Sequence, residues 1–393
     1  MKTLQLFISG TIILQLLSFH AFSSFRIDSL PASKTLFETI THTPKKTDYL
    51  NVSLNTRIAF HTDLSHSDAE QSAFRLDYLR LQVTGNITDR IYYKWLQHLN
   101  RSNSPRNLDN TPASIDCLGV GFHITPTLST FFGKQYADYG GFEYDASPAE
   151  VYEYSDMGEY ITCFLVGVNL AWKFTPSQEL RFQIVDARSE KAEETYGKTP
   201  ESFNAAKAPL GYTVNWNGNF IDNKLLTRCS FSLFHEGKTD NVYFLAMAAA
   251  WVQENFNMYI DAMYSAEDID KLGILSEISA TTEEPVQALH SGYFSLVSRI
   301  NYRILPKLNL FVKGMYETTS ARKDQPLLEE GKYRTSYGYQ GGIEYFPMKE
   351  NLRFFAMYRG RQINYTDRAQ QLGRTNEQPQ HLSLGLIYNI PVF

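Results

Sequence analysis

The chain has 393 residues, of which 14% are aromatic and 20% are charged, and its formal net charge is −5. Beyond residue 24 no apolar run is long enough for a membrane-spanning helix, which excludes a helical membrane protein. The three cysteines are odd in number and widely spaced, so they define neither a disulfide framework nor a metal site. We expect no metal site, and we also expect no cofactor and no nucleic-acid partner.

The N-terminal segment has the pattern of a signal peptide. Lys2 gives a short positive region, the run from Leu4 to Leu17 is apolar, and Ala21-Phe22-Ser23 is a small-x-small cleavage site. A transmembrane anchor is the alternative, but the apolar run is short and polar residues follow it at once. The sequence therefore predicts a signal peptide over 1–23.

The next segment, 24–48, is interpreted as a short periplasmic extension. It is too small for a folded domain, and no internal repeat or low-complexity linker divides the chain after it. We therefore expect 49–393 to form a single structural unit.

Alternation of apolar and polar residues recurs along that unit and predicts β-strands. The predicted strands are 49–60, 74–84, 90–98, 114–123, 127–135, 161–173, 178–187, 208–218, 224–236, 241–252, 254–264, 292–303, 307–318, 334–346, 351–361 and 379–390. Strand 74–84 contains a break in the alternation between Asp77 and Arg80. A break of this kind reverses the face of every residue that follows it on the strand.

The connections between these strands alternate in length. The short connections are 85–89, 125–126, 175–178, 217–223, 254, 305–307 and 348–351, and the others are 61–73, 99–113, 136–160, 188–207, 237–240, 265–291, 319–333 and 362–378. Except for 237–240, every second connection is long, as periplasmic turns and extracellular loops require. A soluble sandwich has no reason for this alternation. The predicted fold is an all-β, transmembrane antiparallel β-barrel of about sixteen strands.

The last strand carries a pattern of its own. Leu382, Leu384, Leu386 and Tyr388 alternate with Ser383, Gly385, Ile387 and Asn389, and the chain closes on Phe393. An amphipathic last strand with a terminal aromatic is the pattern by which outer-membrane barrels are recognised for insertion. It predicts a place in the bacterial outer membrane, contact with outer-membrane lipid, and recognition of Phe393 by the barrel-assembly machinery.

Basic residues dominate the face that the apolar rows leave for the lumen. Arg or Lys on the lipid face costs about 2–4 kcal/mol at the midplane, which favours placing these side chains inside. The predicted pore-lining basic residues are Arg80, Lys94, Lys134, Arg181, Arg228, Arg299, Lys313, Arg353, Arg359 and Arg361, and the clearest acidic ones are Asp77, Asp261 and Glu344. Rings of Arg and Lys favour anions. The alternative is that these bases solvate the lumen and pair with loop carboxylates, and the sequence leaves both interpretations open.

The third long loop, 136–160, is acidic and aromatic and contains no Lys or Arg. Gly140-Gly141 permits a sharp reversal there, and the aromatic side chains favour packing against the inner wall over a solvated external loop. We expect it to fold inward and narrow the barrel. An acidic loop opposite a basic wall would create a transverse field. The predicted constriction residues are Glu143, Asp145, Glu150, Tyr152, Tyr154 and Asp156.

Several of these residues give the chain a resemblance to the phosphate-selective porin O and P family. The resemblance rests on Gly133-Lys134-Gln135, Gly140-Gly141-Phe142-Glu143, Pro148, Tyr154-Ser155 and the strand-and-loop rhythm from 49 to 393. It implies a sixteen-stranded, trimeric, anion-preferring channel, with Lys134 facing the pore at the root of the third loop. The sequence departs from the phosphate-selective members because this loop is wholly acidic. It therefore predicts a general or weakly anion-preferring porin.

The function predicted from the sequence is passive diffusion of small hydrophilic solutes, with a preference for anions such as phosphate if the basic wall dominates. An outer-membrane hydrolase is one alternative, but the candidate groups show no catalytic spacing, so we expect no catalytic residues. Those groups are His98, Ser102, Asp116, His123, His235 and Asp240. A closed barrel acting as an adhesin or anchor is the other alternative. Barrels of about sixteen strands normally leave an aqueous channel, which favours the porin.

Overall fold

The computed structural model describes residues 34–45, 47–64, 72–280, 287–348 and 351–393. The predicted signal peptide and the start of the predicted extension lie outside these residues. In the part of the chain that is described, no helix is long and apolar enough to cross a membrane.

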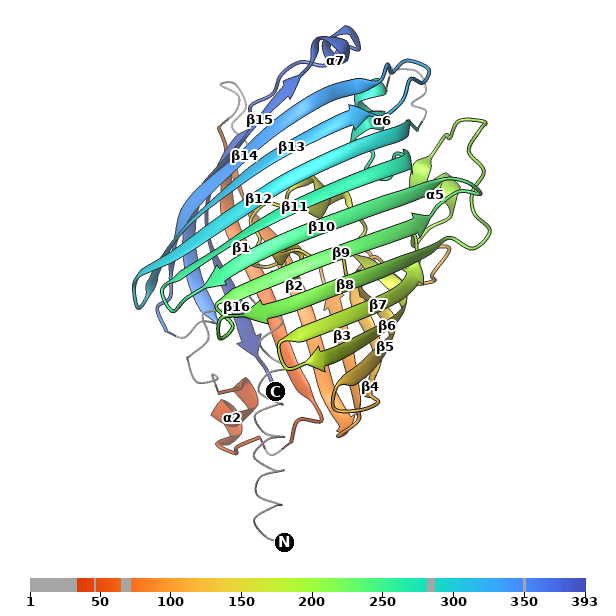
Figure 1. Cartoon of the computed structure of the whole chain (residues 1–393). Coiled ribbons are helices and arrows are strands. Elements are labelled where there is room, and N and C mark those ends of the chain that lie inside the picture. The colour runs from red at the N-terminus through yellow and green to blue at the C-terminus, as the bar shows by residue number, and fades with distance from the viewer. Residues whose placement is uncertain (1–33, 46, 65–71, 281–286, 349–350) are drawn as a thin grey trace.

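The strands form one closed antiparallel barrel (Figure 1). In chain order the described strands are β1 Asn51–Asp63, β2 Ser72–Thr88, β3 Ile91–His98, β4 Ile115–His123, β5 Leu128–Tyr136, β6 Phe164–Thr175, β7 Gln178–Asp186, β8 Leu210–Phe220, β9 Leu225–His235, β10 Asn241–Val252, β11 Phe256–Ile269, β12 Leu289–Leu305, β13 Leu308–Ala321, β14 Gly331–Tyr345, β15 Leu352–Tyr365 and β16 Gln380–Pro391. Each pairs with its neighbours in sequence, and β1 closes the barrel on β16. The predicted fold class is confirmed, and each predicted strand overlaps one observed strand.

The two faces of the barrel follow from the strand period of two. On β13, Val312 is 55% exposed on the outer face, whereas its neighbour Phe311 is 2% exposed on the inner face. On β16, Leu384 is 50% exposed. Outward-facing rows are therefore apolar, as a lipid-facing surface requires.

A β-bulge interrupts this alternation on β2. Arg57 of β1 pairs with Tyr78, but the next residue, Ile58, pairs with Leu76, so Asp77 is the extra residue. The break that the sequence predicts between Asp77 and Arg80 begins at this bulge. It brings Asp77 to the inner face, where its carboxylate contacts Arg57.

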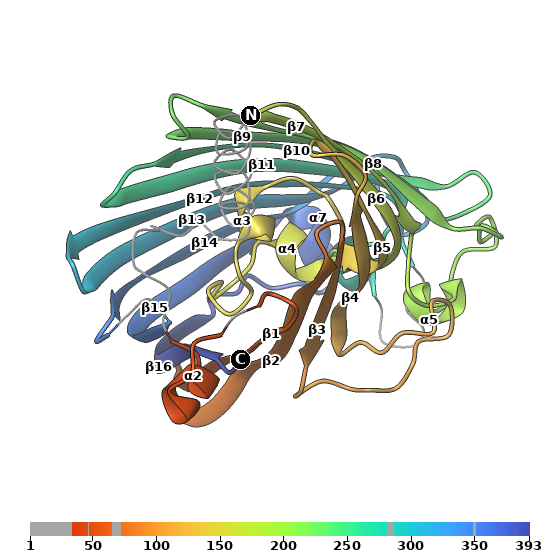
Figure 2. The same ribbon diagram turned by 90° about the horizontal axis from the view of Figure 1, so that it is seen from below.

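Short helices occupy the connections and the N-terminal extension. The described helices are α2 Leu36–Thr41, α3 Phe142–Asp145, α4 Asp156–Tyr160, α5 Ala192–Tyr196, α6 Ile274–Ser279 and α7 Asp367–Gln371. Seen from below, α3 and α4 lie within the ring of strands (Figure 2). The connection that carries them is therefore inside the barrel.

The N-terminal extension docks on the end of the last strand, at the turn end of the barrel (Figure 1). A capping box between Thr35 and Glu38 begins α2. The Phe37 amide donates to the Val392 carbonyl at 3.0 Å. The rings of Phe37 and Phe393 lie 4.8 Å apart between centroids. The C-terminal aromatic is thus partly covered in the folded barrel.

Candidate functional site: the inner loop and the cavity beside it

Residues 137–163, which join β5 to β6, form a segment that we call the inner loop. It turns into the barrel at Gly140 and Gly141, whose φ angles of 68° and 140° suit glycine. A Cβ on Gly140 would lie 2.9 Å from the Ser230 hydroxyl of β9, so only glycine lets the backbone approach the wall this closely. The inward fold therefore begins with a local requirement for glycine.

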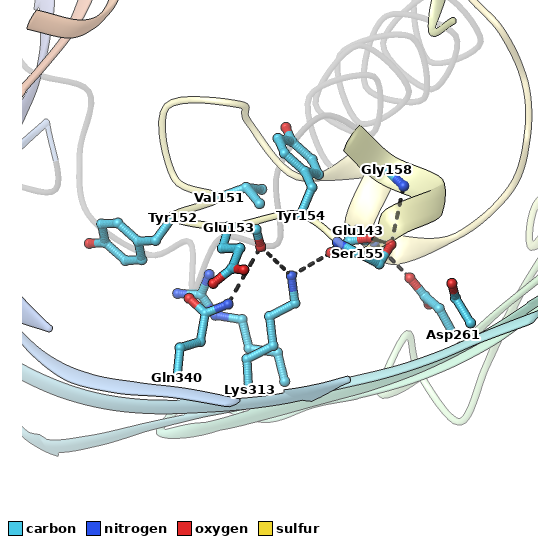
Figure 3. Close-up of polar contacts among 12 residues, drawn as sticks. Glu143, Val151, Tyr152, Glu153, Tyr154, Ser155, Gly158, Asp261, Lys313 and Gln340 are labelled. Atoms are coloured by element: carbon cyan, nitrogen blue, oxygen red, sulfur yellow. Dashed lines mark hydrogen bonds and ion pairs between the residues drawn. The ribbon is translucent and has the colours of Figure 1, made fainter. Parts of the chain in front are cut away.

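Carboxylates of the wall and loop fix the first half of the inner loop. The amides of Phe142 and Glu143 donate to the Asp261 carboxylate of β11 at 3.0 and 2.8 Å. Glu143 is fully buried, forms an ion pair with Lys313 of β13, and accepts the Ser155 amide at 3.1 Å. Figure 3 shows the Lys313 side chain reaching from the wall between Glu143 and the Glu153 backbone. One buried lysine thus holds both halves of the loop.

Aromatic packing covers the start of the loop. The Tyr139 ring lies 5.8 Å from the Phe234 ring and 5.1 Å from the Phe244 ring. Ala246 and Ala248 of β10 are buried beside this cluster. Small side chains on that strand leave the space that the loop fills.

Arginines of β14 and β15 fix the second half. Asp156 pairs with Arg334 at 2.7 Å and with Arg361 at 2.5 Å. Arg361 also contacts the Glu153 carboxylate at 3.2 Å and donates to the Tyr154 carbonyl at 3.0 Å. Because one guanidinium reaches three residues of the loop, it fixes both backbone and side chains.

Tyr152 is the apolar anchor between these two halves. Its hydroxyl donates to Glu344 at 2.8 Å, and its ring lies 5.2 Å from Phe311 and 4.7 Å from Phe355. Burial raises the pKa of Tyr152 well above its ordinary value, so the hydroxyl stays a donor. The residue is therefore held in one position against the wall.

The acidic residues of the inner loop contact the basic wall directly. The described pairs are Asp138–Arg181, Glu143–Lys313, Asp145–Arg228, Glu150–Arg353, Glu153–Arg361 and Asp156–Arg334. Of the two interpretations that the sequence leaves open, the pairing of wall bases with loop carboxylates describes this region. The arrangement gives no support to a field between a separate acidic loop and a basic wall, since the charges touch.

Register places nine of the ten predicted basic residues on the inner face. They are Arg80, Lys94, Arg181, Arg228, Arg299, Lys313, Arg353, Arg359 and Arg361. Among the described residues, four of these form no ion pair with a carboxylate of the inner loop. Arg299 pairs with Glu344 of the wall, and Arg359 reaches the Tyr152 carbonyl. Arg80 is buried against Asp116 at 3.3 Å, and the Lys94 ammonium lies 6.0 Å from the Tyr92 ring.

Lys134 is the exception. Its strand partners are Leu118 and Val166, and it shares a face with Phe132, which is 52% exposed on the outer surface. Its ammonium donates to the Thr111 hydroxyl at 2.8 Å, in the connection between β3 and β4. The pore-facing position expected for Lys134 is therefore corrected: the alternation on β5 puts this side chain outside, beneath that connection.

A cavity of about 190 Å³ remains beside the inner loop, along β1, β2, β15 and β16. It is lined by Arg57, His61, Asp63, Arg75, Asp77, Tyr152, Phe355, Met357, Arg359, His381 and Ser383. Arg57 donates to the Val151 carbonyl at 2.8 Å and lies 3.4 Å from Asp77, whose carboxylate also contacts His61 at 2.9 Å. The inner loop therefore forms one side of the cavity and the barrel wall the other.

The charges around this cavity are not balanced. Three arginines and two aspartates line it, which gives +3 − 2 = +1 with the histidines neutral. Among the described residues, neither Arg75 nor Arg359 has a carboxylate within ion-pair distance. The Arg359 Nε atom is buried without a hydrogen-bond partner, although its Nη1 lies 3.4 Å from the Tyr152 carbonyl. Positive charge is thus available to a solute here.

Several residues of this site are absent from the set predicted from the sequence. Arg57 stands between outward-facing Thr56 and Ile58, so the alternation on β1 was a sufficient signal for it. Arg75 lies beyond the bulge at Asp77, which changes the face of the strand. Only the register reveals that Arg75 and Arg359 line one cavity.

Comparison with known proteins gives a family and a fold. A model of the family described as phosphate-selective porin O and P matches residues 51–390. The outer membrane channel DcaP of Acinetobacter baumannii is a similar structure, with 12% identity, a TM-score of 0.59, and coverage of 86% of this chain and 96% of that chain. OmpF of Salmonella typhi, solved with daunomycin, has 12% identity, a TM-score of 0.57, and coverage of 86% and 97%. OmpT of Vibrio cholerae has 10% identity, a TM-score of 0.55, and coverage of 88% and 100%. No curated protein matches the sequence.

Proposed function

The chain belongs to the family of phosphate-selective porins O and P, and on that premise we propose that it passes small hydrophilic anions through the cavity beside the inner loop. As a porin of this family it lies in the outer membrane of a bacterium, where its closed barrel forms a channel. The proposal concerns the choice of solute and the place where that choice is made.

The guanidinium groups of Arg75 and Arg359, which have no carboxylate partner among the described residues, carry this proposal. The arginines that hold the inner loop are neutralised by its carboxylates, so they contribute little to the field that a solute meets. A single charge contributes about 1 kcal/mol at contact distance in a water-filled space. We therefore expect a preference for chloride over potassium of a few fold, which fits a weakly anion-preferring porin better than a strongly selective one.

The first experiment is the reversal potential in a planar bilayer under a KCl gradient. The wild type is expected to give a potential on the anion side, and Arg75→Gln with Arg359→Gln together to bring it close to zero. Arg368→Gln is a matched control, because this arginine is 43% exposed in an ion pair with Glu329, outside the barrel lumen. A wild-type reversal potential on the cation side contradicts the proposal. So does a double variant whose reversal potential equals that of the wild type. No conductance at all would favour a closed anchor.

We propose further that the barrel is a homotrimer. The side of the barrel formed by the short strands β3, β4 and β5 would then face the partner protomers. β3, β4 and β5 have 8, 9 and 9 residues, whereas β12 has 17. Strands of about 9–11 residues are needed to span a bilayer. β3 is shorter than this and β4 and β5 are at the lower limit, so contact with partner protomers would cover the thinnest part of the wall. One Vibrio cholerae OmpT structure is described as a trimer form. Gel electrophoresis of the unheated protein tests this proposal. A band at the mass of a trimer is expected, and a monomer band would contradict it.

The C-terminal Phe393 bears on how the barrel is inserted into the membrane. Phe393 follows the last strand and is proposed as the signal for the barrel-assembly machinery. Phe393→Ala is expected to lower the amount of protein inserted into the outer membrane.

We propose that the protein is not an enzyme. His98 is 2% exposed and contacts Asp116 at 2.9 Å, which leaves it inaccessible to a substrate. Hydrolysis lost on His98→Ala would contradict this.

A further inference from the structure

The cavity beside the inner loop combines one excess positive charge with an apolar side. From this combination we propose that it binds small organic monocarboxylates with an apolar or aromatic body, in preference to inorganic phosphate. The proposal deepens the proposed function and rests on it, because it names the class of anion that the same site takes.

The balance of charge selects for a single negative charge. With neutral histidines, the lining residues sum to +1, which one carboxylate neutralises. Asp63 and Asp77 lie on the same cavity, and a second negative charge on the solute would meet their repulsion. Inorganic phosphate carries part of a second charge at neutral pH. A monocarboxylate therefore fits this lining better.

Guanidinium groups also match a carboxylate in shape. Arg is planar and offers parallel N–H donors at the spacing of two carboxylate oxygens. Arg359 has a buried Nε without a partner, and Arg75 is exposed and unpaired among the described residues. The Arg57 guanidinium, by contrast, is held by Asp77 and by the Val151 carbonyl. Arg75 and Arg359 are thus the groups left to receive the solute.

The apolar side of the cavity is built rather than incidental. Tyr152, Phe355 and Met357 line it, and the rings of Tyr152 and Phe355 lie 4.7 Å apart. The Tyr152 ring is fixed by its hydrogen bond to Glu344, so the surface it presents is rigid. A hydrated phosphate gains nothing from these side chains. An aromatic or branched body gains about 25 cal/mol for each Å² of apolar surface removed from water.

The size of the cavity agrees with an organic anion. Its volume of about 190 Å³ is well above the ~10–15 Å³ that a cavity needs to hold one water. Acetate or phosphate would leave much of this space to water. A body the size of benzoate occupies more of this space and brings its ring to the apolar side.

The proposal is tested by measuring how added anions block the KCl current through the channel. Sodium benzoate, acetate and phosphate are compared over the same concentration range, at a pH where histidine is neutral. In the wild type, benzoate is expected to reach half-block at a concentration three- to tenfold below acetate and below phosphate. Arg359→Gln is expected to raise the half-block concentration of both carboxylates about tenfold, the loss of one charge-assisted hydrogen bond. Arg368→Gln is the control and leaves all three values unchanged.

Met357→Gln separates charge from apolar contact. This side chain keeps its length but becomes polar, so benzoate is expected to lose its advantage over acetate while acetate itself stays the same. The barrel content of every variant is checked by its heat-dependent mobility on a gel. An anion-side reversal potential with phosphate blocking at least as well as benzoate would overturn this inference and leave the proposed function standing. A cation-side potential would remove both.

Discussion

The buried ion pair between Lys313 and Glu143 offers a direct test of how the inner loop is held. The side chains are 2% and 0% exposed. Lys313→Met keeps the apolar stem but leaves Glu143 charged and buried, with Ser155 as its one hydrogen-bonding partner among the residues that the structure describes. Removing one partner of a buried ion pair costs about 3–5 kcal/mol.

This free energy is expected to act on the loop and not on the barrel. The ladder between β13 and its neighbours is untouched by the substitution, because the bonds of the ladder are made by the backbone. The loop therefore opens locally, which relieves the buried carboxylate without unfolding the strands. The expected results are excursions to a higher single-channel conductance and new protease cleavage within 137–163, at an unchanged thermal midpoint.

The double variant Glu143→Gln with Lys313→Met is the matched control. It leaves no buried charge unpaired, so the steady conductance and the protease resistance are expected to return in large part. A single variant Lys313→Met that conducts as quietly as the wild type and resists the protease would refute the reasoning.

Three further predictions concern other parts of the chain. Lys134→Met is expected to leave the reversal potential unchanged, because its ammonium contacts Thr111 outside the lumen; a shift toward cations would return Lys134 to the pore. Phe37→Ala removes the ring contact with Phe393, worth about 0.5–1.5 kcal/mol, and is expected to lower the thermal midpoint slightly, whereas Phe37→Leu should lower it less. Burial acts to raise the pKa of Glu236, but Lys271 and Arg188 outweigh it and hold the pKa below the ordinary value of 4.5. The stabilisation is therefore present above that value and is lost as the pH falls through the lower, folded-state pKa. Glu236→Gln should flatten this acid dependence of unfolding, and an unchanged slope would contradict it.

Much of the barrel was readable from local patterns. The rows through Leu384 and Val312 face outward because side chains alternate along a strand, and lipid accepts only one of the two faces. The same alternation indicated the inward position of Arg361 and Lys313. The glycine pair at 140–141 marked the turn of the inner loop, since both residues adopt positive φ.

The sequence by itself determined the face of nine of the ten predicted basic residues, and the tertiary structure decided which charges meet. Lys313 and Glu143 are 170 positions apart, and nothing in the chain between them indicates that they form a pair. Facing depends on a period of two residues, so it is a local property until a bulge such as that at Asp77 intervenes. Pairing depends on closure of the barrel and on the path of the inner loop across it. That path neutralises most of the arginines it crosses and leaves Arg75 and Arg359 to the solute.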